Sequence, residues 1–243
     1  MAAGGLRGTV ERDEAEGPLL AHLKAMGWRH VHGPDLQEAA NRAYRDVFLP
    51  GPMAAALRRV NRMPGVASAW MEESDALRIV DDMKRAARNV SAAALPSANE
   101  DATTRLLHGV LEKGPDELDV KVQFADWSTE ALEGTREQVL DRNDFLVVDQ
   151  LRFRNTAGKD EILDLVLFVN GIPVVVIECK SPDLREPLSD AIRDLRAYTG
   201  RPLEDDTREP GAVPRGIPEF FVPVQLLIAA DGKDAALGTI SSD

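Results

Sequence analysis

The spacing of apolar residues divides the chain into a helical first half and a second half rich in strands. Four apolar side chains recur at helical spacing and stop before Gly27, a residue that favours a helix end: Leu19, Leu20, Leu23 and Met26. The helical pattern continues over 36–47, up to Pro50. Further helices are predicted near 52–61, 73–94 and 99–112, and the Ala, Pro and Ser residues at 92–97 indicate a loop. Most of this half is expected to be scaffold.

From about Asp119 the apolar pattern becomes typical of β-strands. The β-rich runs lie at 120–124, 145–153, 163–169, 174–177 and 220–228. One helix interrupts them, beginning near Pro187 and ending at Gly200. Residues 201–216, rich in Pro, Asp, Glu and Arg, are predicted to form a mobile surface loop. We therefore expect one α/β domain, with a mainly helical elaboration in 1–115 and the α/β core in 116–243.

Composition narrows the classes of function. The 243 residues include 29 Lys and Arg against 41 Asp and Glu, a formal net charge of -12. This charge argues against a general nucleic-acid binder, because such affinity comes from cations placed at phosphates. Any DNA contact must be local, metal-assisted or supported by a partner. The lone Cys179 excludes an intrachain disulfide, and neither a signal peptide nor a run of about 20 apolar residues is present. A cytoplasmic protein without a membrane segment is expected.

One stretch, 162–180, carries the residues that suggest chemistry. Two apolar runs meet at Asn170-Gly171, a pair that favours a hairpin turn because both residues tolerate positive φ. Charged residues interrupt the runs only at Asp164, Glu178 and Lys180. Because side chains alternate along a strand, Glu178 and Lys180 are expected to share one face of the sheet.

The register of this hairpin decides whether Asp164 joins them. A two-residue turn at Asn170-Gly171 would send Asp164 to the face away from Glu178. A three-residue turn that adds Ile172, with a glycine bulge, would set Asp164 directly across from Glu178. We predict the three-residue turn, because Pro173 then begins the strand, where its missing N–H is tolerated.

Two carboxylates and an ammonium group at one end of a sheet indicate a metal site. Adjacent carboxylates repel one another and burial disfavours their charged forms, so a divalent cation would compensate both effects. Oxygen ligands suit Mg²⁺ or Mn²⁺, and the backbone carbonyl of Cys179 is a candidate ligand beside Asp164 and Glu178. The ion would lower the pKa of a bound water, and Lys180 would orient that water or stabilise the transition state.

Simpler interpretations of these residues stay open. A Glu-x-Lys triplet alone is expected by chance in so charged a chain, and hairpin ends commonly carry solvated salt bridges. A metal-free structural hairpin is therefore the alternative. His30 and His32 lack a Cys or His partner at zinc spacing, so ordinary surface histidines are expected there.

The order Asp164, Glu178, x, Lys180 is the PD-(D/E)xK nuclease pattern. The chain resembles the N-terminal endonuclease domain of the restriction (R) subunit of type I restriction-modification enzymes. Five segments, which follow the family's order and span almost the whole chain, carry the likeness: 27–28, 143–150, 164–173, 176–182 and 225–232. The resemblance implies an α/β fold with a restriction-endonuclease-like mixed sheet, an αβββαβ core and a helical N-terminal elaboration.

The resemblance also implies roles for single residues. Asp164 and Glu178 would be the Mg²⁺ ligands, and Lys180 would be the catalytic lysine. Glu16 matches by spacing an acid that the family uses on its first helix. The helix is predicted to start at Pro18, however, which leaves Glu16 just outside it and keeps a plain solvated acid as the alternative.

Such nucleases often carry Gln-x-x-x-Tyr on the helix after the Glu-x-Lys strand, and this chain has Asp194 and Tyr198 at that spacing. Both are candidate DNA contacts. A carboxylate in place of an amide only accepts hydrogen bonds, which puts contact through Asp194 in doubt, and a tyrosine packed on the sheet is the alternative for Tyr198. Arg193 and Arg196 on the same helix are further candidate DNA contacts.

The resemblance implies a Mg²⁺-dependent endonuclease that hydrolyses double-stranded DNA, with methyltransferase and specificity subunits as partners. Type I R subunits also use ATP in a motor region, yet no Gly-x-x-x-x-Gly-Lys-Ser/Thr phosphate loop occurs in this chain. We therefore expect the nuclease portion of a longer polypeptide, with ATP needed only by the absent motor. The alternative is a noncatalytic nuclease-like module that docks the motor or the methyltransferase.

Overall fold

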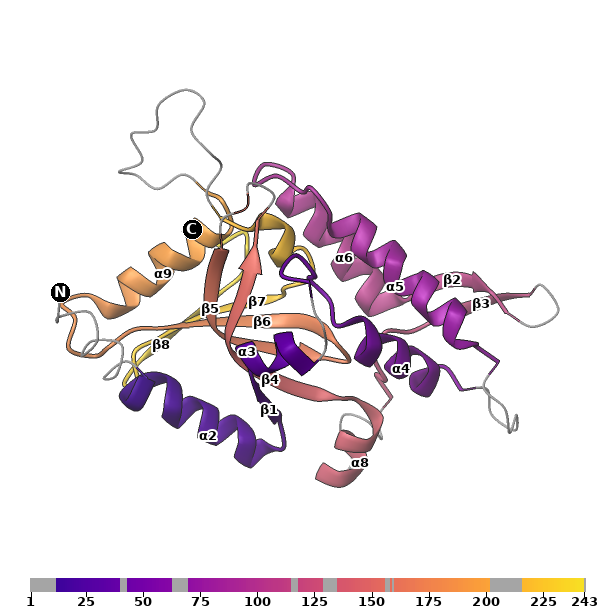
Figure 1. The fold of residues 1–243 in the computed structure, drawn as a ribbon, viewed down its shortest axis with the longest axis horizontal. Helices are drawn as coiled ribbons and strands as arrows, with labels where there is room; N and C mark the ends of the chain where they lie inside the picture. The colour runs from indigo at the N-terminus through magenta and orange to yellow at the C-terminus, as the bar shows by residue number, and fades with distance from the viewer. Residues whose placement is uncertain are drawn as a thin grey trace.

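The computed structural model describes residues 12–39, 43–62, 70–114, 118–128, 135–155, 158, 160–201 and 216–242. Within them, six strands form a mixed sheet in the order β1-β4-β5-β6-β7-β8 (Figure 1). The strands are β1 (Arg29–His32), β4 (Phe145–Arg154), β5 (Asp160–Val169), β6 (Ile172–Cys179), β7 (Leu226–Ala230) and β8 (Ala235–Gly238). β1 runs parallel to β4 and β7 parallel to β6, whereas the other neighbours are antiparallel.

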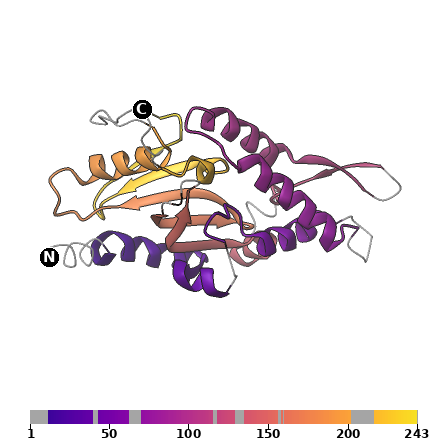
Figure 2. The same cartoon turned by 45° about the horizontal axis from the view of Figure 1, so that its top comes forward.

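Helices cover both faces of this sheet, and Figure 2 shows α2 and α9 on opposite sides of it. The larger core joins one face to α4 (Pro50–Val60), α5 (Glu73–Ala87), α6 (Leu95–His108), α9 (Pro187–Tyr198) and the 3₁₀ turn η3 (Pro218–Phe221). The smaller core packs α2 (Gly17–Met26) against the other face. The remaining elements are the π-helical turn η1 (Arg12–Glu16), α3 (Gly33–Ala39), α8 (Arg136–Arg142) and a two-stranded ribbon of β2 (Val110–Lys113) and β3 (Asp119–Val122).

The fold class expected from the sequence is confirmed. α2, β4, β5, β6, α9 and β7 occur in this order along the chain and form the αβββαβ core, with other elements inserted between α2 and β4. The strands β4 and β5 and the helix α9 lie close to their predicted ranges. The strands β1, β2 and β8 were not expected from the sequence, because strands of four residues show too little alternation to be recognised.

Five expected elements are wrong in part. The helix expected over 73–94 ends at Ala87, and the helix expected over 99–112 ends at His108, since the strand β2 begins at Val110. The helix expected over 36–47 ends at Ala39 as far as it is described, because residues 43–49 are not helical and α4 begins only at Pro50. The loop expected at 92–97 contains the start of α6, which takes its proline in the first turn, where no N–H is needed. The strand expected over 220–228 is a 3₁₀ turn followed by β7. The predicted surface loop at 201–216 lies almost entirely outside the described residues.

The predicted three-residue turn between β5 and β6 is also wrong. Val169 pairs with Ile172, so the turn consists of Asn170 (φ 53°) and Gly171 (φ 77°) alone. Gly171 also packs against the start of α4, where a Cβ atom would lie 2.8 Å from the carbonyl oxygen of Leu49. The close approach and the positive φ together explain why glycine stands at this position.

A register shift in β6 nevertheless puts the two carboxylates opposite each other. Phe168 pairs with Pro173 but Leu167 pairs with Val175, so Val174 is an extra residue in β6. Beyond it, Leu165 pairs with Ile177. Continuing that pairing by one residue places Asp164 opposite Glu178. The bulge lies within the strand, one residue after the proline that cannot donate to the ladder.

No described helix is both long and apolar enough to span a lipid bilayer.

Candidate active site

The β5–β6 hairpin brings Asp164 and Glu178 together. The backbone N–H of Cys179 donates a hydrogen bond to Asp164 Oδ2 at 2.8 Å, and Nε2 of Gln150 donates one to Asp164 Oδ1 at 3.3 Å. These bonds fix the Asp164 carboxylate beside β6, next to Glu178, which is only 2% exposed. The side chains of Glu178 and Val176 lie on the face that α9 covers.

The two oxygens of Glu178 have different surroundings. Nζ of Lys180 donates a hydrogen bond to Oε1 at 2.7 Å. Oε2 is buried and has no hydrogen-bond partner among the described residues. A buried carboxylate oxygen without a donor costs free energy unless a cation or a proton satisfies it.

The pKa values of the two carboxyls reflect this environment. Burial is the main cause that raises the pKa of Glu178 from its ordinary 4.5 to about 8, and the charge of Asp164 adds to the rise, which Lys180 offsets only in part. Burial also raises the pKa of Asp164, against the hydrogen bond from the Cys179 N–H. The pair therefore retains a proton at neutral pH unless a cation replaces it.

Lys180 lies between two carboxylates. Its Nζ is 2.7 Å from Oε1 of Glu178 and 2.8 Å from Oδ2 of Asp194 on α9. Burial opposes the charge of Lys180, but the attraction of both carboxylates outweighs this effect and raises its pKa, so the side chain is a cation. The structure thus pairs the candidate catalytic lysine with a residue considered for DNA contact.

Tyr198 packs on the sheet at the edge of this cluster. Its hydroxyl lies 3.5 Å from Oε1 of Glu178 and 3.4 Å from the carbonyl oxygen of Ile162, and its ring packs against the larger core. Burial and the nearby carboxylates raise the pKa of Tyr198, which keeps the phenol neutral. DNA contact through Tyr198 stays a prediction.

Arg193 and Arg196 have other partners. Arg193 is exposed and forms an ion pair with Asp190 at 3.0 Å on the same helix. Arg196 lines a small hollow between α9 and β8, together with Leu195 and Leu237. DNA contact through either arginine also stays a prediction.

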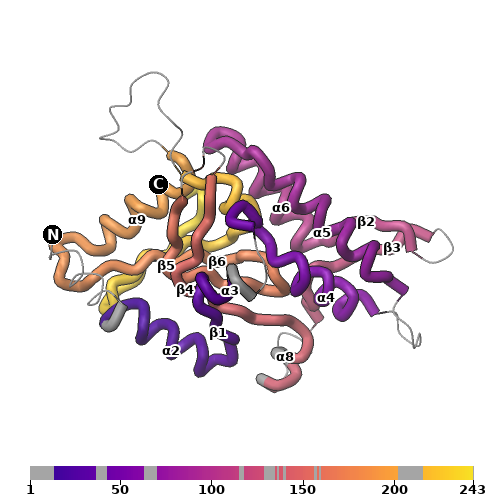
Figure 3. Tube along the Cα trace, viewed as in Figure 1, coloured from indigo at the N-terminus to yellow at the C-terminus, as the bar shows by residue number. Residues whose placement is uncertain are grey.

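Glu16 reaches the cluster through Gln150. Nε2 of Gln150 donates a hydrogen bond to Oε2 of Glu16 at 3.1 Å and so bridges Glu16 and Asp164. The expected helix start at Pro18 lies within one residue of the start of α2 at Gly17, but the π-helical turn η1 directly precedes α2, so Glu16 also has helical dihedral angles. Glu16 is also buried rather than solvated, at 4% exposure. Figure 3 follows the chain from α2 into β1, which lies beside β4, the strand of Gln150.

Sequence reasoning missed Gln150 as a member of the cluster. The residue has a φ of 52° within β4, a left-handed conformation that residues other than glycine seldom adopt. Neutral amides are common in any chain, so the residue type alone did not indicate that Gln150 belongs to the cluster. The only sequence indication was the position of Gln150 at the end of segment 143–150, one of the five segments that carry the likeness.

The contacts of the neighbouring Asp149 were not expected from the sequence either. Its buried carboxylate hydrogen-bonds with Nε2 of His30 at 2.7 Å and with Nδ1 of His32 at 2.9 Å. Burial alone would raise the pKa of Asp149, but these hydrogen bonds outweigh it and the pKa is lowered. The two histidines, expected as ordinary surface residues, are therefore half-buried partners of a buried acid.

The donor set at the carboxylates can be compared with the needs of different metals. Within the described ranges, no three His, Cys, Asp or Glu side chains are grouped closely enough to hold a metal ion by themselves. Asp164 and Glu178 offer two carboxylates and one buried oxygen without a donor. This set suits Mg²⁺, which commonly binds through one or two carboxylates and keeps several waters, and it does not suit zinc.

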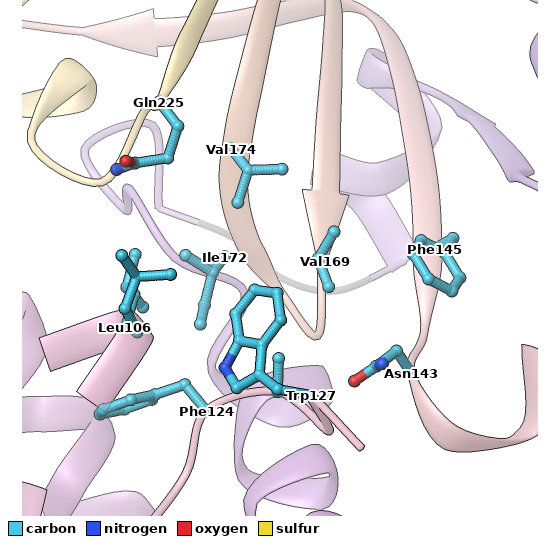
Figure 4. Close-up of a pocket in the computed structure, with 11 residues that line it drawn as sticks. Leu106, Phe124, Trp127, Asn143, Phe145, Val169, Ile172, Val174 and Gln225 are labelled. Carbon is cyan, nitrogen blue, oxygen red and sulfur yellow. The ribbon is translucent and has the colours of Figure 1, made fainter. Parts of the chain in front are cut away.

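An apolar pocket of about 290 Å³ lies at the opposite end of the same hairpin (Figure 4). Val169, Ile172 and Val174 of the hairpin form one side of it, facing Trp127 and Leu106. Its described lining contains no acidic, basic or histidine side chain. Among the described residues of this hairpin, the acidic side chains therefore lie away from the pocket, toward the carboxylate end.

Comparison with known proteins identifies the family. The sequence profile of the family described as "Type I restriction enzyme R protein N terminus" matches residues 9–243. The chain belongs to this family. One relative, from Methanocaldococcus jannaschii, is named as the MjaIXP endonuclease subunit of a type I restriction enzyme and is 23% identical over 94% of this chain. A second family relative, the type I restriction enzyme HindI endonuclease subunit of Haemophilus influenzae, is 27% identical over 96% of this chain. The matches cover 19% and 20% of these relatives, so the chain spans about a fifth of their length.

Proposed function

We propose that the chain is the nuclease domain of a type I restriction enzyme R subunit and hydrolyses DNA phosphodiester bonds with the help of Mg²⁺. The observation that carries this proposal is the buried Oε2 of Glu178, which has no hydrogen-bond partner among the described residues. A carboxylate pair with such an oxygen is best satisfied by a bound cation.

Asp164 and Glu178 would hold the ion, and the backbone carbonyl of Cys179 is a third candidate ligand. Hard oxygen ligands favour Mg²⁺, with Mn²⁺ as a substitute. When bound, the ion supplies positive charge that offsets the charge on the phosphate and lowers the pKa of a water.

Lys180 supplies the cationic side chain of the reaction. Its ammonium group is fixed by Glu178 and Asp194 and can donate a hydrogen bond to the attacking water or to a phosphate oxygen. Glu16, joined to Asp164 through Gln150, adds negative charge that favours a cation at this place.

We assign the whole chain to one endonuclease domain, because Glu16 from the N-terminal part and Asp164 from the sheet share the amide of Gln150. The names of the relatives, endonuclease subunits of type I restriction enzymes, support a subunit of a larger enzyme that acts on DNA. We further propose double-stranded DNA as the substrate, methyltransferase and specificity subunits as partners, and the cytoplasm as the location. With a net charge of -12, the chain alone is expected to bind DNA weakly, so delivery of DNA falls to other parts of the enzyme.

Calorimetric titration with Mn²⁺ tests the metal site without DNA. Binding is expected for the unchanged chain and should disappear in Glu178→Gln and in Asp164→Asn. Asp183→Asn, which neutralises an exposed carboxylate in the loop after β6, is the matched control and should bind as the unchanged chain does. Absence of Mn²⁺ uptake by the folded chain would favour the noncatalytic docking module instead.

Plasmid nicking in Mg²⁺ tests the chemistry. Slow cleavage is expected from the chain alone, because DNA binding is weak. Loss of that cleavage in Asp164→Ala, with circular dichroism unchanged, would support the assignment, whereas robust cleavage by Asp164→Ala would reject it.

A further inference from the structure

Two carboxylates contact Lys180, and only one of them, that of Glu178, is a proposed metal ligand. Asp194 stands one helical turn before Tyr198 on α9, and its Oδ2 is 2.8 Å from Nζ of Lys180. Glu178 binds the same ammonium group from β6, at 2.7 Å. The Lys180 side chain is 16% exposed, so both ion pairs are partly shielded from water.

Glu178 and Asp194 are expected to act differently once a divalent cation is present. Glu178 is a proposed ligand, so its charge is then shared between the cation and Lys180, and the cation also repels the ammonium group. Asp194 contacts Lys180 but is not among the proposed ligands, so it keeps its full charge for the lysine. Without Asp194, Lys180 would depend on Glu178 alone and would compete with the cation for that carboxylate.

The helix is suited to hold Asp194 in place. Ala191 and Leu195, the buried residues of α9, pack against the sheet. Asp194 lies beside Leu195 and is 36% exposed in its side chain, so it is half-buried rather than free to follow DNA. An anion at this position also repels a phosphate, which argues against direct contact between Asp194 and the DNA backbone.

We propose that Asp194 is a positioning residue that takes over the ammonium group of Lys180 when Glu178 binds the metal ion. The inference rests on the proposed function of the site. It assigns to Asp194 a role that glutamine could not fill in the same way, because a neutral amide has no charge with which to hold an ammonium group away from Glu178.

A double-mutant cycle on Mn²⁺ affinity tests this role. Calorimetry would compare the unchanged chain, Asp194→Asn, Lys180→Met and the double variant, with thermal melts confirming that each is folded. Asp194→Asn is expected to weaken Mn²⁺ binding about tenfold more when Lys180 is present than in the Lys180→Met chain. Asp194→Glu should restore most of the affinity, because it keeps the charge. Asp190→Asn, an equivalent change one turn earlier on α9, is the matched control and should have little effect.

The outcomes separate the two proposals. Equal losses from Asp194→Asn with and without Lys180 would mean that Asp194 acts only through its charge at a distance, and the positioning role would be rejected. Failure of Asp194→Glu to restore affinity in a folded chain would reject it too. If the unchanged chain binds no Mn²⁺, the proposed function is rejected, and the positioning role of Asp194 is rejected with it.

Discussion

Replacing Glu178 by glutamine should change how the stability of the chain depends on pH. Glu178 is 2% exposed, and its pKa is raised from 4.5 to about 8, with burial as the largest cause and the charge of Asp164 as the second. In the absence of divalent cations, the folded chain therefore keeps a proton that the unfolded chain releases near its ordinary pKa. Glutamine has no proton to lose, so it removes this difference.

The sign and size of the effect follow from linkage. A folded-state pKa above the unfolded value gives stability that is complete below about pH 4.5 and is lost as the pH rises through about 8. The free energy of unfolding should fall by about 1 kcal/mol for each pH unit in that window, and by about 3 kcal/mol between about pH 5 and about pH 8. Asp164 is coupled to Glu178, so part of the effect belongs to the pair.

Urea unfolding at several pH values, in the presence of a chelator, measures this difference. The curve of unfolding free energy against pH should be flatter for Glu178→Gln than for the unchanged chain, and Asp183→Asn should follow the unchanged chain. Saturating Mn²⁺ should stabilise the unchanged chain most at the alkaline end, where the ligand is ionised. Parallel pH curves for Glu178→Gln and the unchanged chain would refute the claim that this carboxyl holds a proton in the folded state.

Three further predictions follow from the same contacts. Mn²⁺ affinity should rise up to about tenfold per pH unit below about pH 8, because Glu178 must release its proton to bind the ion. Calorimetry in buffers of different ionisation enthalpy should detect the released proton, and a pH-independent affinity would contradict this prediction. Asn170→Ala should lower the free energy of unfolding by about 3 kcal/mol, because the hydrogen bonds of the buried amide are lost and alanine must keep a φ of 53°. Urea unfolding measures this loss, and a loss below about 1 kcal/mol would contradict the reasoning. Gly33→Ala should weaken Mn²⁺ binding and stability together, because its Cβ atom would lie 2.3 Å from the carbonyl oxygen of Gln150, and Gly51→Ala, with open space around it, is the control.

The sequence by itself determined the class of fold and the main pair of acids. Period-two runs and an Asn-Gly turn are local properties, and they predicted β4, β5 and the hairpin within a few residues. The order Asp164, Glu178, x, Lys180 depends only on spacing along the chain. Strand alternation predicts that Glu178 and Lys180 share a face, and the hydrogen bond between them agrees with this, although β6 itself ends at Cys179.

Only the tertiary structure decided how Asp164 meets Glu178. The extra residue was expected in the turn, because Pro173 would then begin the strand, and that turn is wrong. In the structure, Asn170 and Gly171 form the tight turn that their backbone preferences favour, and Val174 supplies the extra residue inside β6. A single inserted residue anywhere between the two acids restores their shared face. The alternation of side chains therefore constrains the number of residues between Asp164 and Glu178 and not the position of the extra residue.

The other members of the cluster also depend on contacts between distant segments. Glu16 is joined to Asp164 only because β1 lies beside β4 and lets Gln150 reach both acids. Asp194 meets Lys180 because the buried face of α9 packs on β6 and β7. Local patterns record hydrogen bonding and burial along one segment, whereas the partner of a buried charge is chosen by packing between segments, which the spacing of residues along the chain does not encode.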